Sequence, residues 1–251
     1  MSTERAGTLG VAVVVPVFRD TESVRALLAA MDAWTPPPQE VVVASGESDA
    51  ALAELCRERG CSYIEAPRNR GAQLDLGARE ARASVLWFLH ADVVAPRQGI
   101  GAIRRAIEGG AESGCFRLAF QGRPAWHKSL LAALIALRVR AGGTAYGDQA
   151  LFATREAYDE CEGFAHQPLF EEARLVRRLR RRGTFSLLPE SVGVSTRRWE
   201  RDGWLRRTLH NRWLALCYML GVPAERLAGA YGPLDNAERK RPGADEVSDR
   251  S

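Results

Sequence analysis

Apolar and polar segments alternate regularly along the first third of the chain. Short strands are predicted at residues 10–17, 40–44, 61–65 and 85–89, and the continuous apolar run at 85–89 is typical of a strand buried on both faces. Helical patterns separate them at about residues 21–33, 50–59 and 73–83. This alternation predicts an α/β fold with a single Rossmann-like, mostly parallel sheet and helices on both of its faces. Right-handed crossovers connect the parallel strands.

The rest of the chain mixes helices with fewer strands. Strands are predicted at residues 114–120, 150–154 and 184–188. Helices are predicted from Pro96 to about residue 108, and at residues 125–140, 156–161, 171–182, 204–220 and 223–230. Loops are predicted at residues 67–71, 142–149, 163–170 and 195–199. We expect an N-terminal extension over residues 1–9, one domain over residues 10–232 and a disordered tail over residues 233–251.

The apolar run Val85–Leu89 ends abruptly in His90, Ala91 and Asp92. Ligands of open α/β sheets bind outside the carboxyl ends of the strands. A carboxylate at that place suits a divalent metal that carries phosphates. The alternative is that Asp92 caps the next helix or turns the chain. We expect His90 to be a structural histidine rather than a metal ligand.

Composition excludes several classes of protein. Hydrophobic residues make up 46% of the chain and charged residues 26%, which is typical of globular proteins, and the net charge of +4 is too small to indicate nucleic-acid binding. The five cysteines lack zinc-ligand spacing, so we expect reduced core thiols in a cytosolic protein. A cleavable signal and an apolar run of about 18 residues are both missing, so we expect a soluble or peripheral protein.

Acidic residues recur at or near the predicted strand ends. They are Asp20, Asp49, Asp92, Asp148, Glu171 and Glu172. Several acids at one edge of a sheet, with Arg197 and Arg198 available for phosphate oxygens, suit a metal-diphosphate ligand. A carboxylate away from the metal can take a proton from an attacking hydroxyl. Neither a G-x-G-x-x-G nor a Walker A sequence is present, which argues against a dinucleotide-binding Rossmann domain and a P-loop NTPase.

Six short motifs follow one another along the chain. They are Pro16-Val17-Phe18-Arg19-Asp20, the segment Arg70–Ala78, Leu89-His90-Ala91-Asp92, Gly147-Asp148-Gln149, Phe170-Glu171-Glu172 and Arg197-Arg198-Trp199. In this order the chain resembles family 2 glycosyltransferases of the GT-A fold over roughly residues 10–230. Within that family it resembles a bacterial group found beside radical-SAM/selenodomain or arsenosugar genes.

The resemblance implies an inverting transfer from a nucleotide-diphosphate sugar, foremost a UDP-sugar, to the hydroxyl of a small-molecule or lipid acceptor. It implies that Glu172 is the general base with Glu171 beside it, and that Asp92 holds Mg²⁺ or Mn²⁺ with the diphosphate. The residues implied to bind the nucleotide sugar are Pro16, Val17, Asp20, Gln73, Asp148, Arg197, Arg198 and Trp199. Nucleic acid is not implied. The expected location is cytoplasmic, with peripheral contact to the inner face of the membrane left open.

The chain departs from the family pattern at several positions. Ala44 stands where the family has the acid that reads the base, Asp75 replaces an asparagine, and Glu172 replaces an aspartate. Ala44 motivates one alternative, a nucleotide-sugar-binding module that has lost catalysis. A second alternative, a sugar nucleotidyltransferase, is disfavoured because no glycine- and arginine-rich phosphate loop follows the first strand.

Helix capping is the simpler interpretation for some of these acids. Asp20 and Asp49 each precede a predicted helix, where a carboxylate can accept a hydrogen bond from a backbone N–H. The pair Glu171-Glu172 opens another predicted helix, where negative charge favours the helix dipole. The family motif favours catalysis over capping for this pair.

Overall fold

The computed structural model describes residues 9–231, which divide into two compact units after Ser195. Residues 1–8 and 232–251, which hold most of the predicted extension and the whole predicted tail, lie outside the described residues.

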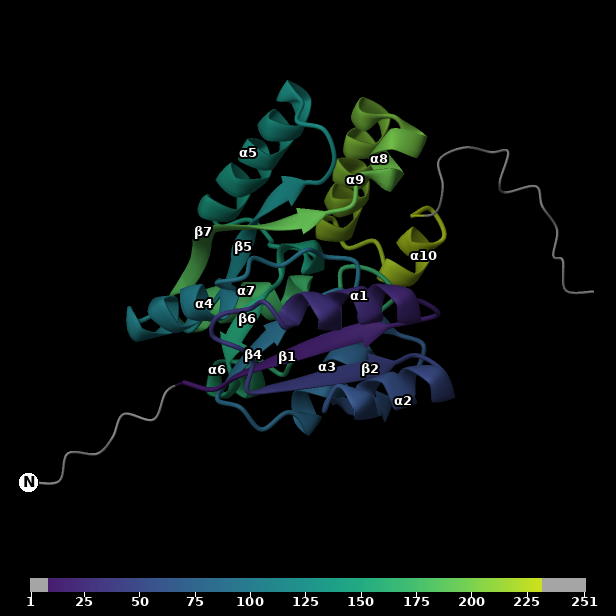
Figure 1. Cartoon of the computed structure of the whole chain (residues 1–251). Coiled ribbons are helices and arrows are strands. Elements are labelled where there is room, and N and C mark those ends of the chain that lie inside the picture. Colours follow the sequence, from purple (N-terminus) through teal and green to yellow (C-terminus); the bar gives the residue numbers. More distant parts are fainter. Residues whose placement is uncertain (1–8, 232–251) are drawn as a thin grey trace, which may run out of the picture. The chain divides into compact units, whose positions relative to one another are not determined.

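The first unit is built around one seven-stranded sheet (Figure 1). Its strands are β1 (Val11–Val17), β2 (Glu40–Ser45), β3 (Ser62–Glu65), β4 (Val85–Phe88), β5 (Ser113–Phe120), β6 (Phe152–Thr154) and β7 (Phe185–Val194). Its helices are α1 (Thr21–Met31), α2 (Ala50–Glu58), α3 (Arg70–Glu80), α4 (Gly99–Glu108), α5 (Trp126–Arg140), α6 (Arg155–Glu160) and α7 (Ala173–Arg182), with a short 3₁₀ turn, η1 (Gly147–Gln149). Within residues 9–231, every helix falls short of the length or the hydropathy that a membrane crossing requires.

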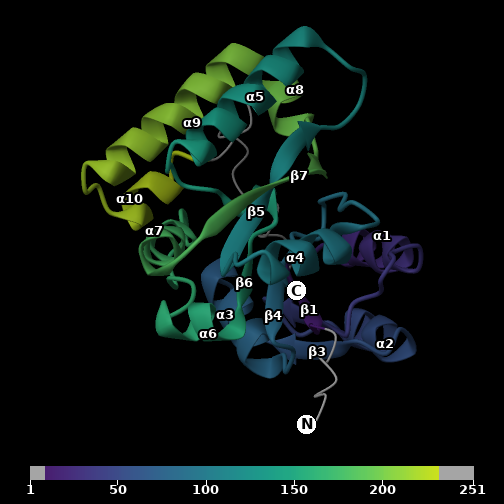
Figure 2. The same ribbon diagram turned by 90° about the vertical axis from the view of Figure 1, so that its left-hand side faces the viewer.

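The strands lie in the order β3-β2-β1-β4-β6-β5-β7 (Figure 2). β1 to β4 pair in parallel, as predicted. Both faces of β1 are buried: Val13 and Val15 join a core that includes residues of α1, α2 and α4, while Ala12 and Val14 join a second core that includes residues of α3, α6 and α7. Burial on two faces explains why the strand is a continuous apolar run.

The direction of β6 decides which segments meet at the edge of the sheet. β6 is antiparallel to both of its neighbours, β4 and β5. Trp87 pairs with Phe152, and the Phe88 N–H donates to the Leu151 carbonyl at 2.8 Å. The chain that leads into β6 therefore lies at the edge where β4 ends.

Side-chain caps fix the starts of three helices. Asp20 accepts a hydrogen bond from the Ser23 N–H at 3.2 Å, and Asp49 accepts one from Leu52 at 3.0 Å, which confirms the capping interpretation for both acids. Asn69 accepts from Ala72 N–H at 3.0 Å, so α3 begins at Arg70. The prediction of a loop through residue 71 and a helix from residue 73 was wrong because it overlooked this cap.

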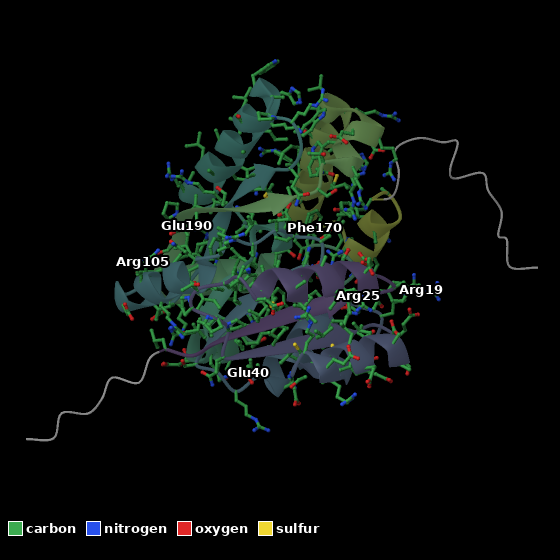
Figure 3. All side chains as sticks on the ribbon, viewed as in Figure 1. Arg19, Arg25, Glu40, Arg105, Phe170 and Glu190 are labelled. Atoms are coloured by element: carbon green, nitrogen blue, oxygen red, sulfur yellow. The ribbon has the colours of Figure 1, made fainter. Side chains whose placement is uncertain are left out.

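The last strand of the sheet is longer than predicted. β7 continues past Pro189, where the sequence pattern indicated an end, and its pairing with β5 shifts from Phe116–Leu188 to Arg117–Ser191. Proline cannot donate to the ladder and is tolerated at bulges. In the bulge, Glu190 pairs with Arg105 of α4 at 3.0 Å (Figure 3).

The second unit is helical over its described residues. It contains α8 (Arg197–Asp202), α9 (Trp204–Met219) and α10 (Ala224–Ala228). The prediction of a loop at residues 195–199 was wrong from Arg197 onward. Two hydrogen bonds hold this turn. The Thr196 hydroxyl donates to the Glu200 carboxylate at 2.7 Å, and the Glu200 N–H donates to the Thr196 carbonyl.

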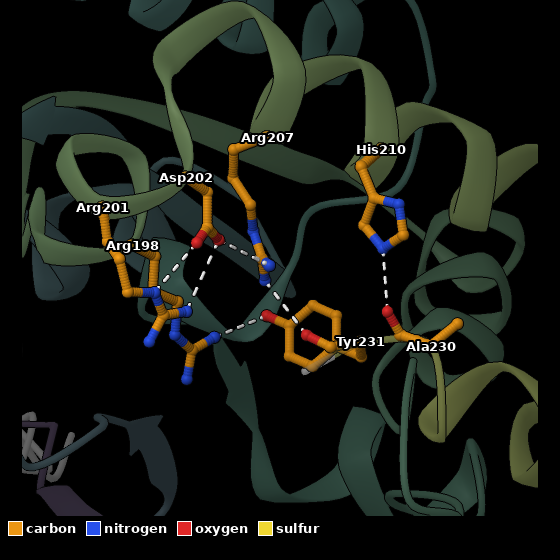
Figure 4. A network of polar contacts seen from close by, with 7 residues as sticks. All are labelled: Arg198, Arg201, Asp202, Arg207, His210, Ala230 and Tyr231. Carbon is orange, nitrogen blue, oxygen red and sulfur yellow. Dashed lines mark hydrogen bonds and ion pairs between the residues drawn. The ribbon is translucent and has the colours of Figure 1, made fainter. Parts of the chain in front are cut away.

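A buried ion pair lies at the centre of the second unit (Figure 4). Arg207 of α9 is only 1% exposed and contacts the Asp202 carboxylate at 3.1 Å. Arg201 contacts the same carboxylate at 2.8 Å, and Arg207 also donates to the Tyr231 carbonyl at 3.3 Å. The His210 ring nitrogen lies 2.9 Å from the Ala230 carbonyl. These contacts tie α8, α9 and the segment after α10 together.

Candidate functional site

Asp92 and Asp148 meet at the carboxyl edge of the sheet. Asp92 follows β4, and Asp148 lies in η1, which leads into the antiparallel β6. Burial raises the pKa of the Asp148 carboxyl, and the negative charge of Asp92 raises it further. The charges of Arg138 and Arg70 act in the opposite direction. The structure thus brings together two of the predicted acids through the reversed direction of β6.

Glu172 is the most perturbed carboxyl group of this site. Glu172 is buried, with only 4% of the residue exposed. Burial raises its pKa well above the usual value, and the charges of Glu171 and Asp148 add to this effect, while that of Arg70 opposes it. Glu172 stands at the start of α7 but makes no capping hydrogen bond through its side chain. The capping interpretation therefore does not account for this residue.

Glu171 is held by a contact from a distant part of the chain. Its carboxylate lies 3.1 Å from the guanidinium of Arg70, at the first residue of α3. Gly71 permits this approach, because a Cβ atom at that position would lie 2.0 Å from the Ala165 carbonyl oxygen. The Ala165 N–H in turn donates to the Glu171 carbonyl at 3.1 Å. The role of Arg70 was not predicted from the sequence.

The loop before Glu171 is anchored by the buried carboxylate of Asp75. This carboxylate accepts a hydrogen bond from the Tyr158 hydroxyl at 3.1 Å and lies 3.2 Å from a ring nitrogen of His166. Arg79, one turn further along α3, contacts it at 3.0 Å. Burial raises the pKa of the Tyr158 hydroxyl, with a further contribution from the Asp75 charge. The family's asparagine could not form these ion pairs, so the aspartate has a structural reason here.

The glycine-rich segment that carries Asp148 is fixed by side-chain contacts. The Arg138 guanidinium lies 4.6 Å from the centre of the Tyr146 ring and 3.4 Å from the Gln149 amide oxygen. Gln149 is fully buried and its amide donates to the Phe116 carbonyl at 3.3 Å. Arg138 is a second cation of the candidate site that was not selected from the sequence.

At the end of β1, the predicted nucleoside residues form a packed corner. Pro16 and Val17 are buried, and the Gln73 amide donates to the Val17 carbonyl at 2.7 Å. Gln73 therefore links α3 to the end of β1, and Asp20 is engaged as a cap. The Phe18 ring, which was not selected from the sequence, lies 4.1 Å from the Arg68 guanidinium and offers an aromatic surface beside this corner.

Ala44 is buried completely, on the face of β2 that meets α3. A Cβ atom on Gly77 would lie 3.7 Å from the Ala44 methyl group and 2.5 Å from Val14. A longer side chain at position 44 would therefore point into the contact between this strand and α3. The family's base-reading acid is thus replaced by a residue that has no access to a ligand.

The acids of the site fit a metal ion that takes most of its ligands from outside the protein. Within residues 9–231, no group of three His, Cys, Asp or Glu side chains is arranged to hold a metal. Asp92 is exposed at the strand end. A single accessible carboxylate suits Mg²⁺ or Mn²⁺ whose remaining ligands come from phosphate oxygens and water.

Three predicted binding residues belong to the second unit. Arg198 donates to the Tyr231 hydroxyl at 2.8 Å, and the Trp199 ring stacks on Trp204 with 6.1 Å between centroids. Arg197 is exposed on α8. Their implied role over the diphosphate stays a prediction.

Solved structures share this architecture. S. aureus TarS 1-349 with UDP-GlcNAc has a TM-score of 0.58 and 14% identity over 74% of this chain and 58% of that one. The M. tuberculosis glucosyl-3-phosphoglycerate synthase with Mn²⁺, UDP and glucosyl-3-phosphoglycerate has a TM-score of 0.54 and 16% identity over 75% and 71% of the two chains. The Pyrobaculum calidifontis mannosyltransferase PcManGT with GDP-Man and Mn²⁺ has a TM-score of 0.60 and 15% identity over 88% and 68%.

At these identities the likeness concerns the fold, which is the GT-A fold that the sequence motifs implied. This chain spans less than two thirds of the TarS chain. No curated protein matches the sequence. The family model described as "Glycosyl transferase family 2" matches residues 12–181, which is more than half of the chain and includes Asp92, Asp148, Glu171 and Glu172. The chain therefore belongs to glycosyl transferase family 2.

Proposed function

We propose that the protein transfers a sugar from a nucleotide-diphosphate donor to an acceptor hydroxyl, with inversion at the anomeric carbon. The observation that carries this proposal is the pair of buried carboxyls, Glu171 and Glu172, beside Asp148 at the sheet edge. Family membership supports the reaction class.

Glu172 is the general base of the proposed reaction. Its burial and its acidic neighbours raise its pKa well above the usual value, which makes the ionised carboxylate a stronger proton acceptor near neutral pH. It takes the proton from the acceptor hydroxyl as the oxygen attacks the sugar. Glu171, which pairs with Arg70, lies next to Glu172 and contributes to the raised pKa of Glu172.

The donor binds along the edges of β1 and β4 in this proposal. Pro16, Val17 and Gln73 form the corner for the nucleoside, with the Phe18 ring as an added stacking surface. Asp148 faces the donor sugar or the acceptor. Asp20 belongs to the same binding segment through the cap that shapes it.

Asp92 would hold Mg²⁺ or Mn²⁺ together with the diphosphate. When bound, such an ion neutralises the negative charge that develops on the leaving diphosphate. Arg197, Arg198 and Trp199 would cover the diphosphate and the sugar. Two of the similar structures contain Mn²⁺ with a nucleotide, which supports the metal.

The identity of the donor, the acceptor and the cellular location are proposed from the sequence motifs. We propose a UDP-sugar donor, although the similar structures include both UDP and GDP-Man complexes. The proposed acceptor is a small-molecule or lipid hydroxyl. The protein is proposed to be a bacterial enzyme of the radical-SAM/selenodomain-associated group. Its proposed location is cytoplasmic, with peripheral access to the inner face of the membrane. The alternative, a module that binds nucleotide sugars without transfer, draws support from the buried Ala44.

The test is the release of nucleoside diphosphate from a panel of nucleotide sugars, with Mg²⁺, with Mn²⁺ and with a chelator. We expect turnover that needs a metal, and a loss of about 100-fold or more for Glu172→Gln. Glu80→Gln, which changes an exposed glutamate at the end of α3, is the matched control. Binding of nucleotide without any difference in turnover between wild type and Glu172→Gln would establish the binding module instead.

A further inference from the structure

Helix α5 carries apolar side chains on two opposite faces. One face packs on β5 and β7, with Val139 buried and Ile135 against the core. The other face is exposed and holds large apolar residues at intervals of four, four and three. These are Trp126, Leu130, Leu134 and Leu137, with exposed fractions of 78%, 51%, 46% and 62%. This spacing places them in one stripe along the helix.

Helix α9 of the second unit repeats the pattern. Its inner face holds the buried Arg207 and Leu214, and His210 reaches the carbonyl of Ala230 (Figure 4). The opposite face is exposed over the whole length of the helix. It holds Leu205, Leu209, Trp213, Leu216, Met219 and Leu220, each at least 50% exposed. Among the described residues, the only exposed large hydrophobic side chain outside α5, α9 and the residue that ends α9, Leu220, is Val94.

The exposed charge around both stripes has one sign. Residues 121–147 contain no acid and four basic residues. Residues 203–222 contain no acid and three basic residues, of which Arg207 is buried and paired with Asp202. The chain as a whole is nearly balanced, with 35 basic and 31 acidic residues. Arg123 and Arg140 are exposed near the two ends of α5, and Arg206 and Arg212 are exposed on α9.

We propose that the exposed faces of α5 and α9 are surfaces that dock on a membrane containing anionic lipid. An apolar stripe with tryptophan and with exposed arginines beside or within it has the composition of an interfacial helix, whose apolar side enters the headgroup boundary while the cations reach lipid phosphates. A second copy of this chain is a poorer partner, because it would place arginine opposite arginine. The proposal concerns where the protein works and does not depend on sugar transfer.

The full chain would be sedimented with phosphatidylglycerol-containing vesicles and with pure phosphatidylcholine vesicles. We expect sedimentation with the anionic vesicles, weaker sedimentation with the neutral ones, and a decrease with added salt. Leu130→Ser with Leu134→Ser, and separately Leu209→Ser with Leu216→Ser, should each weaken the partition by about tenfold or more. Val94→Ser is the matched control, because it removes an exposed apolar group elsewhere and should leave the partition unchanged.

Circular dichroism and nucleotide binding without vesicles would show that the variants stay folded, since all four leucines are exposed. Three results would each overturn the proposal. The first is a wild-type chain that stays in solution with anionic vesicles. The second is equal sedimentation of wild type and both serine pairs. The third is a wild-type dimer in analytical ultracentrifugation that the serine pairs dissociate, without any vesicle binding. A failed transfer assay would leave these results unaffected.

Discussion

The guanidinium of Arg70 lies 3.1 Å from the carboxylate of Glu171, across 101 residues of sequence. The Arg70 side chain is 44% exposed, whereas that of Glu171 is 3% exposed. Solvent thus reaches the cation but hardly reaches the carboxylate. The charge of Arg70 also lowers the pKa of Glu172 and of Asp148. The first turn of α3 therefore supplies a cation that partly offsets the acids of the site.

Replacing Arg70 by methionine should change the pH dependence of the enzyme. Glu171 would lose its partner, which should lower the free energy of unfolding by about 1 to 3 kcal/mol. The pKa of Glu172 should rise further, so the pH at which kcat/KM is half-maximal should move upward. Arg25→Met, on the exposed side of α1, is the control. An unchanged pH profile for Arg70→Met would contradict this role.

Glu172 should make the ligand-free protein less stable as the pH rises. The folded protein binds this proton more tightly than the unfolded chain, because burial raises the pKa of Glu172 in the folded state. Its stabilising contribution is therefore fully present below the usual glutamate pKa and is lost as the pH rises through the raised pKa. Urea unfolding between acidic and neutral pH should show this slope in the wild type and in Glu80→Gln. The slope should be smaller in Glu172→Gln, and an equal slope would refute the assignment.

The Asp75 anchor should act on transfer more than on nucleotide binding. Asp75→Asn removes the ion pair with Arg79 and changes the contact with the His166 ring nitrogen, which lies in the loop before Glu171. We expect kcat to fall by about tenfold, because a misplaced base costs rate. The affinity for nucleoside diphosphate, measured by calorimetry, should change little. The double variant Asp75→Asn with His166→Gln should lose no more than the worse single variant, since the two residues act through one contact. Fully additive losses would argue against the anchor.

Restoring the family's acid at position 44 should damage the protein rather than improve binding. Ala44 is fully buried, close to Gly77 where α3 approaches β2. An aspartate there would be an unpaired carboxyl group in an apolar contact, so Ala44→Asp should lower the free energy of unfolding by about 3 kcal/mol or more. Ala44→Ser is the milder comparison. A stable Ala44→Asp protein with tighter binding of uridine diphosphate would show that the side chain reaches the ligand.

The sequence predicted the first half of the sheet because β1, β2 and β4 are buried on two faces and each helix between the strands has its own pattern. It did not predict the direction of β6, since a three-residue apolar strand carries no directional signal. Asp92, Asp148, Glu171 and Glu172 could be selected because acids near strand ends and family motifs both point to them. Arg70 could not, because arginine is the commonest charged residue of this chain and a contact over 101 residues leaves no local pattern.

The bulge in β7 has a consequence for how the strand tolerates insertion and deletion. Pro189 and Glu190 add two residues between Leu188 and Ser191, so the alternation of sides is kept and Leu188 and Val192 reach the same core. Removing one of the two residues would leave a bulge of one extra residue, in which Val192 and Val194 can keep their pairing with β5 and their present face. Removing both would keep every later side chain on its present face and would lose only the pair that Glu190 makes with Arg105. The bulge therefore absorbs length variation at this point of the strand before it reaches the core residues that follow.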